Sequence, residues 1–324
     1  MHVIMPMAPI FYVLAPEYIR LLLHPVLYYL HSGDWPQNYT IHDLGEHYPN
    51  ATGHDDGNAE VMPVEESGNL LALMYMYERA SGDKDYKNQF LDTLNKYADY
   101  LVESGLHPEK QLSTDDGAGE ATNQTGLAVK AAIALNAYGV MTNQPRYSDV
   151  GRHFAAALYN ETGGTDSKRT RFTMVQGDDN SWSLQFNLYL DVLLGLNTFP
   201  TDAYKMQTEF YPTVRKEAGV PLDSRDSWTK TDWMVFAAAT AMAPGVRNEG
   251  VRDMFIYDIH AYMTNGLNNV PFSDKFWTES KMDRHGNNHD VGTYDMYKAR
   301  PVAGGHFALL ALSGPDQWQG HGKN

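Results

Sequence analysis

Two kinds of helical segment alternate along this chain. One kind is apolar almost all the way round, as in helices buried on every side, and covers about 66–80, 123–140, 182–195, 231–242 and 302–312. The other kind has one apolar stripe and one polar face, as in an outer layer, and covers about 85–104, 145–159, 202–216 and 249–264. Long polar loops precede the buried segments. This alternation predicts an all-α fold, an (α/α)6 six-hairpin toroid with an inner and an outer ring.

The helix count falls short of a complete six-hairpin ring. A further helix is predicted from Pro16 to His31, which brings the total to ten, whereas six hairpins need twelve. Because the chain starts abruptly at Met1, we expect a toroid that lacks its first hairpin, and a single N-terminally truncated domain over residues 1–324. A plain helical bundle or an α-solenoid is the alternative, although no repeat of fixed length supports a solenoid. The stretch from Arg171 to Val175 is a possible short strand.

Composition limits the classes of partner. The net charge of −15 argues against nucleic acid and anionic membrane, because both attract basic surfaces. Cysteine is absent, and no apolar run reaches the roughly 18 residues that span a bilayer. Residues 1–14 lack the features of a signal peptide. Four Asn-x-Ser/Thr triplets, which begin at Asn38, Asn50, Asn123 and Asn160, favour a secreted glycoprotein.

Five polar loops lie directly ahead of the buried segments and are expected to meet at one end of the toroid. The longest covers residues 32–66 and is rich in His, Asp and Gly. Long loops of this chemistry are uncommon in compact domains unless they are functional. The loops supply carboxylates, amides, Trp and Arg, which suit a small polar substrate and acid/base chemistry by paired carboxylates. The candidate site residues in these loops are His42, Asp43, Glu65, Glu66, Asp115, Asp116, Trp182, Asp232, Arg300 and His306.

Several of these residues have a structural interpretation as well. Carboxylates at a helix start can act as caps or balance the helix dipole, and Glu65 and Glu66 suit both that interpretation and catalysis. The segment with Asp55, Asp56 and Glu60 could hold a structural cation, or form a solvated acidic turn. Arg300 could clamp a carboxylate of the substrate or pair with a loop aspartate.

No cofactor is expected from the sequence, and no metal is assigned to the site. The histidines of the long loop, His42, His47 and His54, are not at the spacing of helical metal ligands, and no His-Glu-x-x-His motif is present. The sequence therefore gives no reason to expect zinc.

Long ordered motifs resemble the C-terminal six-hairpin domain of the fungal glutaminase A family. The motifs are HDLGEHYPNATGHDDGNAEVMPVEESGNLL, QLSTDD, NQTGLAVKAA, DDNSWSLQFNLYLDVLLGLN, MQTEFYPTVRKEAGVPLDSR, TKTDW and ARPVAGGHFALLAL. The resemblance implies a six-hairpin toroid and a secreted hydrolase that converts L-glutamine to L-glutamate and ammonia. It also implies β-rich domains upstream as partners. The toroid is similar, by fold alone, to that of inverting glycosidases such as fungal glucoamylase, where a Glu-Glu pair ahead of a buried helix includes the general acid.

Three functions remain open from the sequence. In the first, a glutaminase-type amidohydrolase uses Glu65 or Glu66 as general acid, one of Asp43, Asp115 and Asp232 to activate water, and Arg300 to hold the substrate α-carboxylate. The second is a toroid-type glycoside hydrolase, favoured by several Trp and Tyr residues near the loops. The third is a fragment without catalytic activity.

Overall fold

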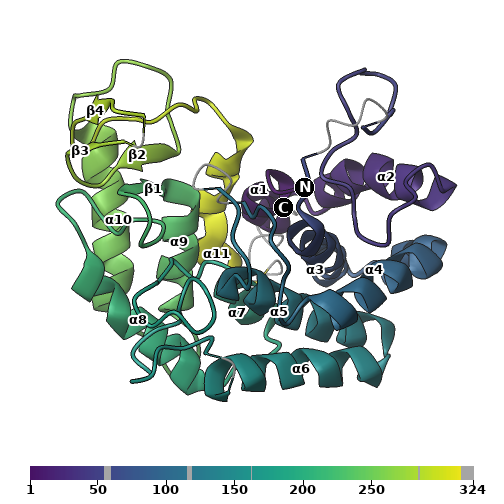
Figure 1. The fold of residues 1–324 in the computed structure, drawn as a ribbon. Helices are drawn as coiled ribbons and strands as arrows, with labels where there is room; N and C mark the ends of the chain where they lie inside the picture. Colours follow the sequence, from purple (N-terminus) through teal and green to yellow (C-terminus); the bar gives the residue numbers. More distant parts are fainter. Residues whose placement is uncertain (55–59, 115–118, 162, 284, 315–324) are drawn as a thin grey trace, which may run out of the picture.

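The computed structural model describes residues 1–54, 60–114, 119–161, 163–283 and 285–314. Six helical segments form the inner ring, shown in Figure 1. They are α1 (Ile4–Leu14), α3 (Pro63–Ser81), α5 (Thr125–Thr142), α7 (Leu188–Leu194), α9 (Thr231–Thr240) and the consecutive pair η3 (Pro301–Phe307) and α11 (Ala308–Ala311). Each packs against the next, and η3 and α11 pack against α1, which closes the ring.

The outer layer consists of the amphipathic helices. These are α2 (Glu17–Ser32), α4 (Leu91–Ser104) preceded by η1 (Tyr86–Phe90), α6 (Pro145–Asn160), α8 (Thr201–Val214) and α10 (Glu249–Thr264). The alternation of inner and outer helices predicted from the sequence is confirmed. Short turns lead from an inner helix to the next outer helix, and long loops lead from outer to inner. The long loops therefore lie at the N-terminal ends of the inner helices.

Helix α1 is the largest departure from the sequence-based expectation. Its apolar sequence contains Pro9, which argues against a helix interior because proline lacks the N–H that an α-helix needs. The chain nevertheless forms a helix there, with Met5, Ala8 and Tyr12 buried. The expectation was that the first hairpin is lacking. Helix α1 fills an inner position that the sequence did not predict, and the described residues supply six inner and five outer helical segments, one outer segment short of six hairpins.

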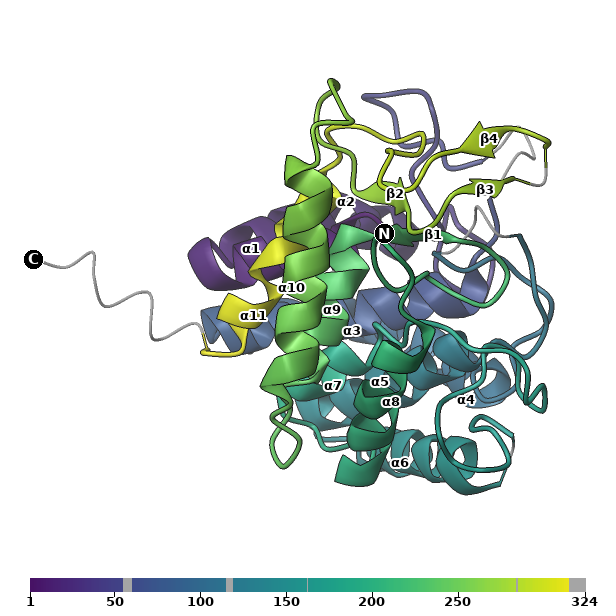
Figure 2. The same ribbon diagram turned by 90° about the vertical axis from the view of Figure 1, so that its left-hand side faces the viewer.

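Short strands form within the loops between the helices. Strand β1 (Trp228–Lys230) pairs antiparallel with β2 (Lys275–Trp277), with Trp228 opposite Trp277. Strand β3 (Lys281–Met282) pairs with β4 (Asn288–His289), and Figure 2 shows both pairs beside the upper end of α10. The stretch 171–175 forms single bridges to Thr165 and Gln124 rather than a strand. None of the described helices has the length and apolar character that crossing a bilayer requires.

Two consecutive glycines allow the ring to close. A Cβ atom at Gly304 would lie 2.6 Å from the carbonyl oxygen of Met7, and one at Gly305 would lie 2.8 Å from that of Pro6. Both distances are shorter than van der Waals contact. Both neighbouring atoms belong to the backbone, which cannot move aside easily. The glycine pair therefore permits η3 to approach the backbone of α1.

Replacing Gly304 by Ala is expected to lower the free energy of unfolding by about 1–3 kcal/mol, the usual cost of overpacking. Chemical denaturation of both proteins measures the difference. Gly250→Ala is the matched control, because its Cβ would meet nothing closer than 3.5 Å and the helix favours Ala. If the two variants were equally stable, close packing of η3 on α1 would not depend on Gly304.

Candidate active site

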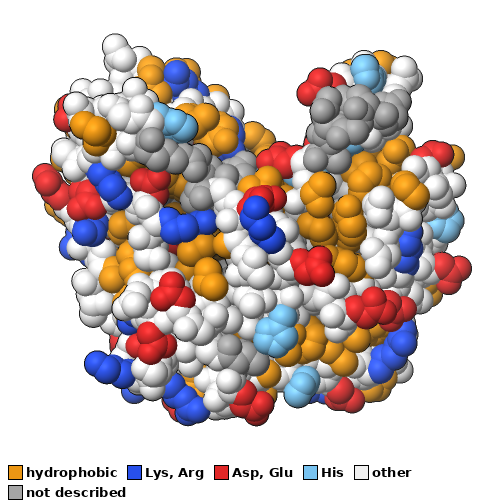
Figure 3. Space-filling model, viewed as in Figure 1, with side chains coloured by type: hydrophobic (Ala, Val, Ile, Leu, Met, Phe, Trp, Pro, Cys, Tyr) orange, Lys and Arg blue, Asp and Glu red, His pale blue; other side chains and the backbone are white. Residues whose placement is uncertain are grey.

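The N-terminal ends of the inner helices gather the polar residues of the chain. Glu65 and Glu66 lie in the first turn of α3, and Asp232 lies in the first turn of α9. All three side chains are at most 1% exposed. Figure 3 shows a hollow between two projections at this end, one carrying β2 to β4 and the other carrying the loop ahead of α3. Buried carboxylates beneath an open end are typical of a catalytic site.

Glu65 is held by a buried cation from the neighbouring inner helix. Its Oε1 atom forms an ion pair with Nζ of Lys130. Lys130 also donates to Oδ1 of Asn69 at 2.7 Å, and Asn69 donates to Glu65 Oε1 at 3.2 Å. The absence of a side chain at Gly68 makes room, since a Cβ there would lie 2.7 Å from Cγ of Lys130. The position of Glu65 is therefore fixed by a charge on α5.

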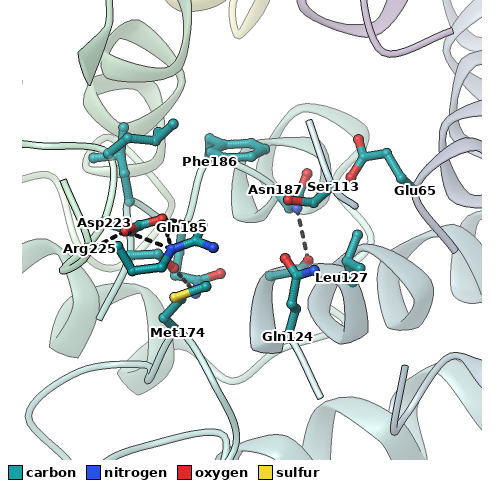
Figure 4. A pocket seen from close by; sticks show the side chains of 14 residues that line it. Glu65, Ser113, Gln124, Leu127, Met174, Gln185, Phe186, Asn187, Asp223 and Arg225 are labelled. Carbon is teal, nitrogen blue, oxygen red and sulfur yellow. Dashed lines mark hydrogen bonds and ion pairs between the residues drawn. The ribbon is translucent and has the colours of Figure 1, made fainter. Parts of the chain in front are cut away.

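Glu65 lines a pocket, and its second oxygen is buried. Among the described residues, Oε2 has no hydrogen-bond partner, and the same holds for Oε1 of Gln185. Both residues line one pocket, shown in Figure 4, with Asp223 and Arg225 on the side opposite Glu65. Arg225 is ion-paired with Asp223. Buried acceptors are normally satisfied, so this pocket suits a group that brings its own donors.

Glu66 points in a different direction from Glu65. Its Oε1 accepts hydrogen bonds from the nitrogen of Met1 at 2.9 Å and from the amide of His2 at 3.0 Å, and its Oε2 accepts one from Asn69 at 3.0 Å. Burial opposes the charge of Glu66, but the positive charge at Met1 and the bonds from His2 and Asn69 outweigh it. The pKa of Glu66 therefore lies well below its usual range. Glu66 is a fully engaged anion.

Asp43 and His42 belong to a cluster within the longest loop. Oδ2 of Asp43 lies 2.8 Å from Nδ1 of His42, Oδ1 lies 2.8 Å from Nε2 of His54, and Oδ1 accepts from the amide of Gly45 at 2.7 Å. Burial acts against this carboxylate, but the bond from Gly45 and the two histidines lower its pKa. The interactions described for Asp43 order the loop.

A second buried cluster surrounds Asp232. Lys230 donates to its Oδ2 at 3.3 Å, and Lys230 also lies 3.9 Å from Asp274. Oδ1 of Asp232 has no hydrogen-bond partner among the described residues. Arg300 binds Asp274 through two bonds, at 3.0 and 2.5 Å. The pairing of Arg300 with a loop aspartate, one of the two interpretations of the sequence, is thus present.

The pKa of Asp232 predicts a pH dependence of stability. Burial raises this pKa to about 6, with the charge of Lys230 opposing the shift and that of Asp274 adding to it. The folded chain therefore keeps a proton that the unfolded chain has lost, so stability falls as pH rises from about 4 to about 6. Between pH 4 and pH 7 the free energy of unfolding should fall by roughly 1–3 kcal/mol less in Asp232→Asn than in the parent, as measured by chemical denaturation at each pH. The exposed Asp149→Asn should follow the parent, and a similar course for Asp232→Asn would contradict the assignment.

The remaining residues predicted from the sequence lie at different places. His306 accepts or donates through Nε2 to Thr231 at 2.9 Å, and burial lowers its pKa, with Asp274 acting in the opposite direction. Trp182 packs edge-on against Phe210, with ring centroids 5.8 Å apart, and does not line the Glu65 pocket. Asp115 and Asp116 lie outside the described residues, as do Asp55 and Asp56 of the possible cation site.

Sequence reasoning missed Lys130, Gln185, Asp223 and Arg225. Lys130 had a signal, because it is the one charged residue in the otherwise uncharged helix α5. A buried lysine requires a partner, and that requirement points to a buried carboxylate. Gln185 had no comparable signal, since its place in the pocket depends on how 182–187 folds ahead of α7.

The arrangement of the helices places this chain among proteins built on the (α/α)6 toroid. A rhamnosidase from Klebsiella oxytoca with rhamnose bound superposes with a TM-score of 0.62 at 14% identity, over 97% of this chain and 57% of that one. A bacterial glucoamylase complexed with acarbose superposes with a TM-score of 0.61 at 12% identity, over 98% of this chain and 50% of that one. At such identities the likeness establishes the fold alone.

The chain belongs to the glutaminase A six helical-hairpin domain family, whose model matches residues 1–310. Glutaminase A of Aspergillus oryzae is 39% identical over 317 residues, which are 96% of this chain and 44% of that protein. A probable glutaminase of Arthroderma benhamiae is 29% identical, again over 96% of this chain and 44% of that protein. The chain thus spans less than half the length of these curated relatives.

Proposed function

We propose that this chain carries the catalytic centre of a glutaminase-type amidohydrolase, which converts L-glutamine and water to L-glutamate and ammonia. The observation that carries the proposal is Oε2 of Glu65, a buried carboxylate oxygen without a partner among the described residues, on a side chain that lines a small, largely apolar pocket. The names of the curated relatives support this choice of substrate. Of the two adjacent glutamates, Glu65 is preferred because both oxygens of Glu66 are engaged.

In the proposed reaction, Glu65 acts on water. Its Oε2 accepts a proton while the water oxygen adds to the carboxamide carbon of glutamine. The resulting intermediate collapses as the carbon–nitrogen bond breaks, and the carboxyl of Glu65 returns the proton to the departing nitrogen. General acid/base catalysis of this kind contributes about 10²–10⁴-fold. Lys130 keeps Glu65 in place, and Asp232, whose pKa is raised, is better suited to donate a proton than to activate water.

Binding of the substrate is proposed to place its carboxamide group, rather than the whole molecule, in this pocket, whose volume is about 40 Å³. Oε2 of Glu65 and Oε1 of Gln185 are two acceptors on one pocket and suit the donors of an ammonium or a carboxamide. The sequence-based role of Arg300 as holder of the α-carboxylate is less well supported. Arg300 lines a different pocket from Glu65, and both of its bonds go to Asp274.

A toroid-type glycoside hydrolase is the second candidate, and it rests on the fold. Trp228, Trp277 and Tyr297 line a cleft of about 340 Å³, as sugar platforms do. Their faces are already covered, however. Lys275 lies 3.8 Å from the ring centroid of Trp228, His289 stacks on Trp277 at 4.1 Å, and Arg300 lies 3.9 Å from that of Tyr297. Amide hydrolysis is therefore preferred.

An activity screen separates the candidates. The purified chain is incubated with L-glutamine, L-asparagine and a panel of glycans, and release of ammonia and of reducing sugar is measured. We expect ammonia from glutamine. Reducing sugar without ammonia would establish the glycosidase instead. Inactivity towards every substrate would favour a fragment without catalytic activity, unless the upstream β-rich domains expected from the family restore ammonia release when added.

We also propose that the protein is extracellular. The asparagines of three Asn-x-Ser/Thr triplets, Asn38, Asn50 and Asn160, are exposed, as glycan attachment requires. When the chain is expressed through a eukaryotic secretory pathway, treatment with an endoglycosidase should lower its apparent mass. An unchanged mass would remove this support.

A further inference from the structure

Two histidines and a buried glutamate meet beside the hollow at the loop end. His2 precedes α1, His42 lies in the longest loop, and Glu66 lies in the first turn of α3. Nδ1 of His2 lies 2.7 Å from Nε2 of His42 and 3.5 Å from Oε1 of Glu66. One ligand atom from each residue lies within 4.8 Å of the others, the single such group among the described residues. The two imidazole rings stack with centroids 4.6 Å apart.

The partner of His42 fixes which nitrogen carries its hydrogen. Nδ1 lies 2.8 Å from Oδ2 of Asp43, and a carboxylate accepts, so Nδ1 is the donor. The lone pair of His42 is therefore on Nε2, which lies 2.7 Å from Nδ1 of His2. An imidazole oriented by a carboxylate on its far nitrogen is the usual outer shell of a histidine that binds a metal.

We infer that His2, His42 and Glu66 bind one divalent transition-metal ion, with zinc as the ion that fits best. Imidazole nitrogen and carboxylate oxygen suit zinc, whereas calcium and magnesium prefer sites made of oxygen. Ligands at about 2.0–2.1 Å from a tetrahedral ion lie about 3.3 Å apart. The separations of 2.7 Å between His2 and His42 and 3.5 Å between His2 and Glu66 lie on either side of that value, and the third, between His42 and Glu66, is within 4.8 Å. Small side-chain shifts would open the site.

The local charges favour the ion. Two ring nitrogens at 2.7 Å share one hydrogen, and the metal would replace it. Its charge would compensate the buried Glu66, in place of the hydrogen bond that the nitrogen of Met1 now donates to Oε1. Oε2 of Glu60 lies 3.6 Å from Nε2 of His42 and supplies a fourth ligand. The sequence did not suggest this site because His2 and His42 are 40 residues apart.

Such an ion would tie three distant segments together: the start of α1, the longest loop and the start of α3. It would also reach the proposed catalytic centre through Asn69, which bonds both Glu66 and Glu65. The inference concerns structure and does not depend on the substrate. It stands or fails independently of the glutaminase proposal.

The test measures binding rather than activity. The purified chain is stripped with a chelator, dialysed against zinc, and analysed for bound metal and for thermal unfolding. We expect one zinc per chain and a rise in Tm of about 3–6 °C at a hundredfold excess over Kd, with no rise in magnesium or calcium. Cobalt in place of zinc should give the visible absorption of a four-coordinate ion.

Variants locate the site. His42→Gln should abolish the zinc-dependent rise in Tm, and Asp43→Asn should weaken zinc binding about 10–100-fold, because it removes the orienting carboxylate. His31→Gln is the control, an exposed histidine on α2 bonded to Thr93 of α4, and should bind zinc like the parent. Circular dichroism of the stripped variants checks that they fold. Zinc bound equally by His42→Gln and the parent, or no zinc bound by the parent, would overturn the inference.

Discussion

Replacing Glu65 by Gln should lower kcat for ammonia release from glutamine by about 10²–10⁴-fold, the range for loss of a general acid/base. The amide cannot accept a proton from water, although it is nearly the same size as the carboxyl. The change of charge falls on a residue that is 1% exposed, so folding must be checked by thermal unfolding alongside the kinetics. KM should change far less than kcat if Glu65 acts on water.

Two other glutamates of α3 provide the comparison. Glu78 also pairs with a lysine, Lys87, at 2.7 Å, but at the opposite end of the helix. Glu78→Gln should therefore keep the activity of the parent. Glu66→Gln should affect stability more than turnover, because its oxygens are engaged with the chain. Full turnover in a folded Glu65→Gln variant would refute the assignment of Glu65 as the group that acts on water.

Lys130→Met should be the most destabilising single change near the site. It leaves Glu65 buried without its cation, and breaking a buried ion pair from one side costs about 3–5 kcal/mol. The free energy of unfolding from urea denaturation measures the loss. Since the pair holds Glu65 over the pocket, activity should fall as well.

The double variant Lys130→Met with Glu65→Gln separates charge from packing. Removing both charges should restore part of the lost stability, because no uncompensated carboxylate remains. Lys87→Met, which breaks the less buried pair with Glu78, should cost about 1 kcal/mol or less. If Lys130→Met cost no more than Lys87→Met, the ion pair would not be the main support of Glu65.

The alternation of inner and outer helices was predictable because it follows from the faces that each helix must bury. Helix α1 was not, because Pro9 disfavours a helix locally and the packing of α1 against η3 and α3 outweighs that preference. Propensity is a local property, whereas closure of the ring brings together segments about 300 residues apart in the sequence.

The choice between Glu65 and Glu66 shows how far the site could be predicted from the sequence. Adjacent residues on a helix point about 100° apart, so one facing the pocket implies that the other does not. The sequence places both in the first turn of α3, but which one faces the pocket depends on Lys130 from α5 and on His2 from the chain start. The pairing of Arg300 with Asp274 was one of two open alternatives for the same reason, because it joins different loops.

Because η3 closes the ring by packing on α1, the first inner helix to be synthesised is covered by the last one. The face of α1 with Pro6, Met7 and Ile10 is covered by η3, which with α11 leaves the ribosome last among the inner segments. At about 5–20 residues per second, α1 waits roughly 15–60 seconds for that partner. A nascent chain therefore carries an uncovered apolar strip for most of its synthesis, and a chaperone that binds such strips would act on α1 before any other inner helix.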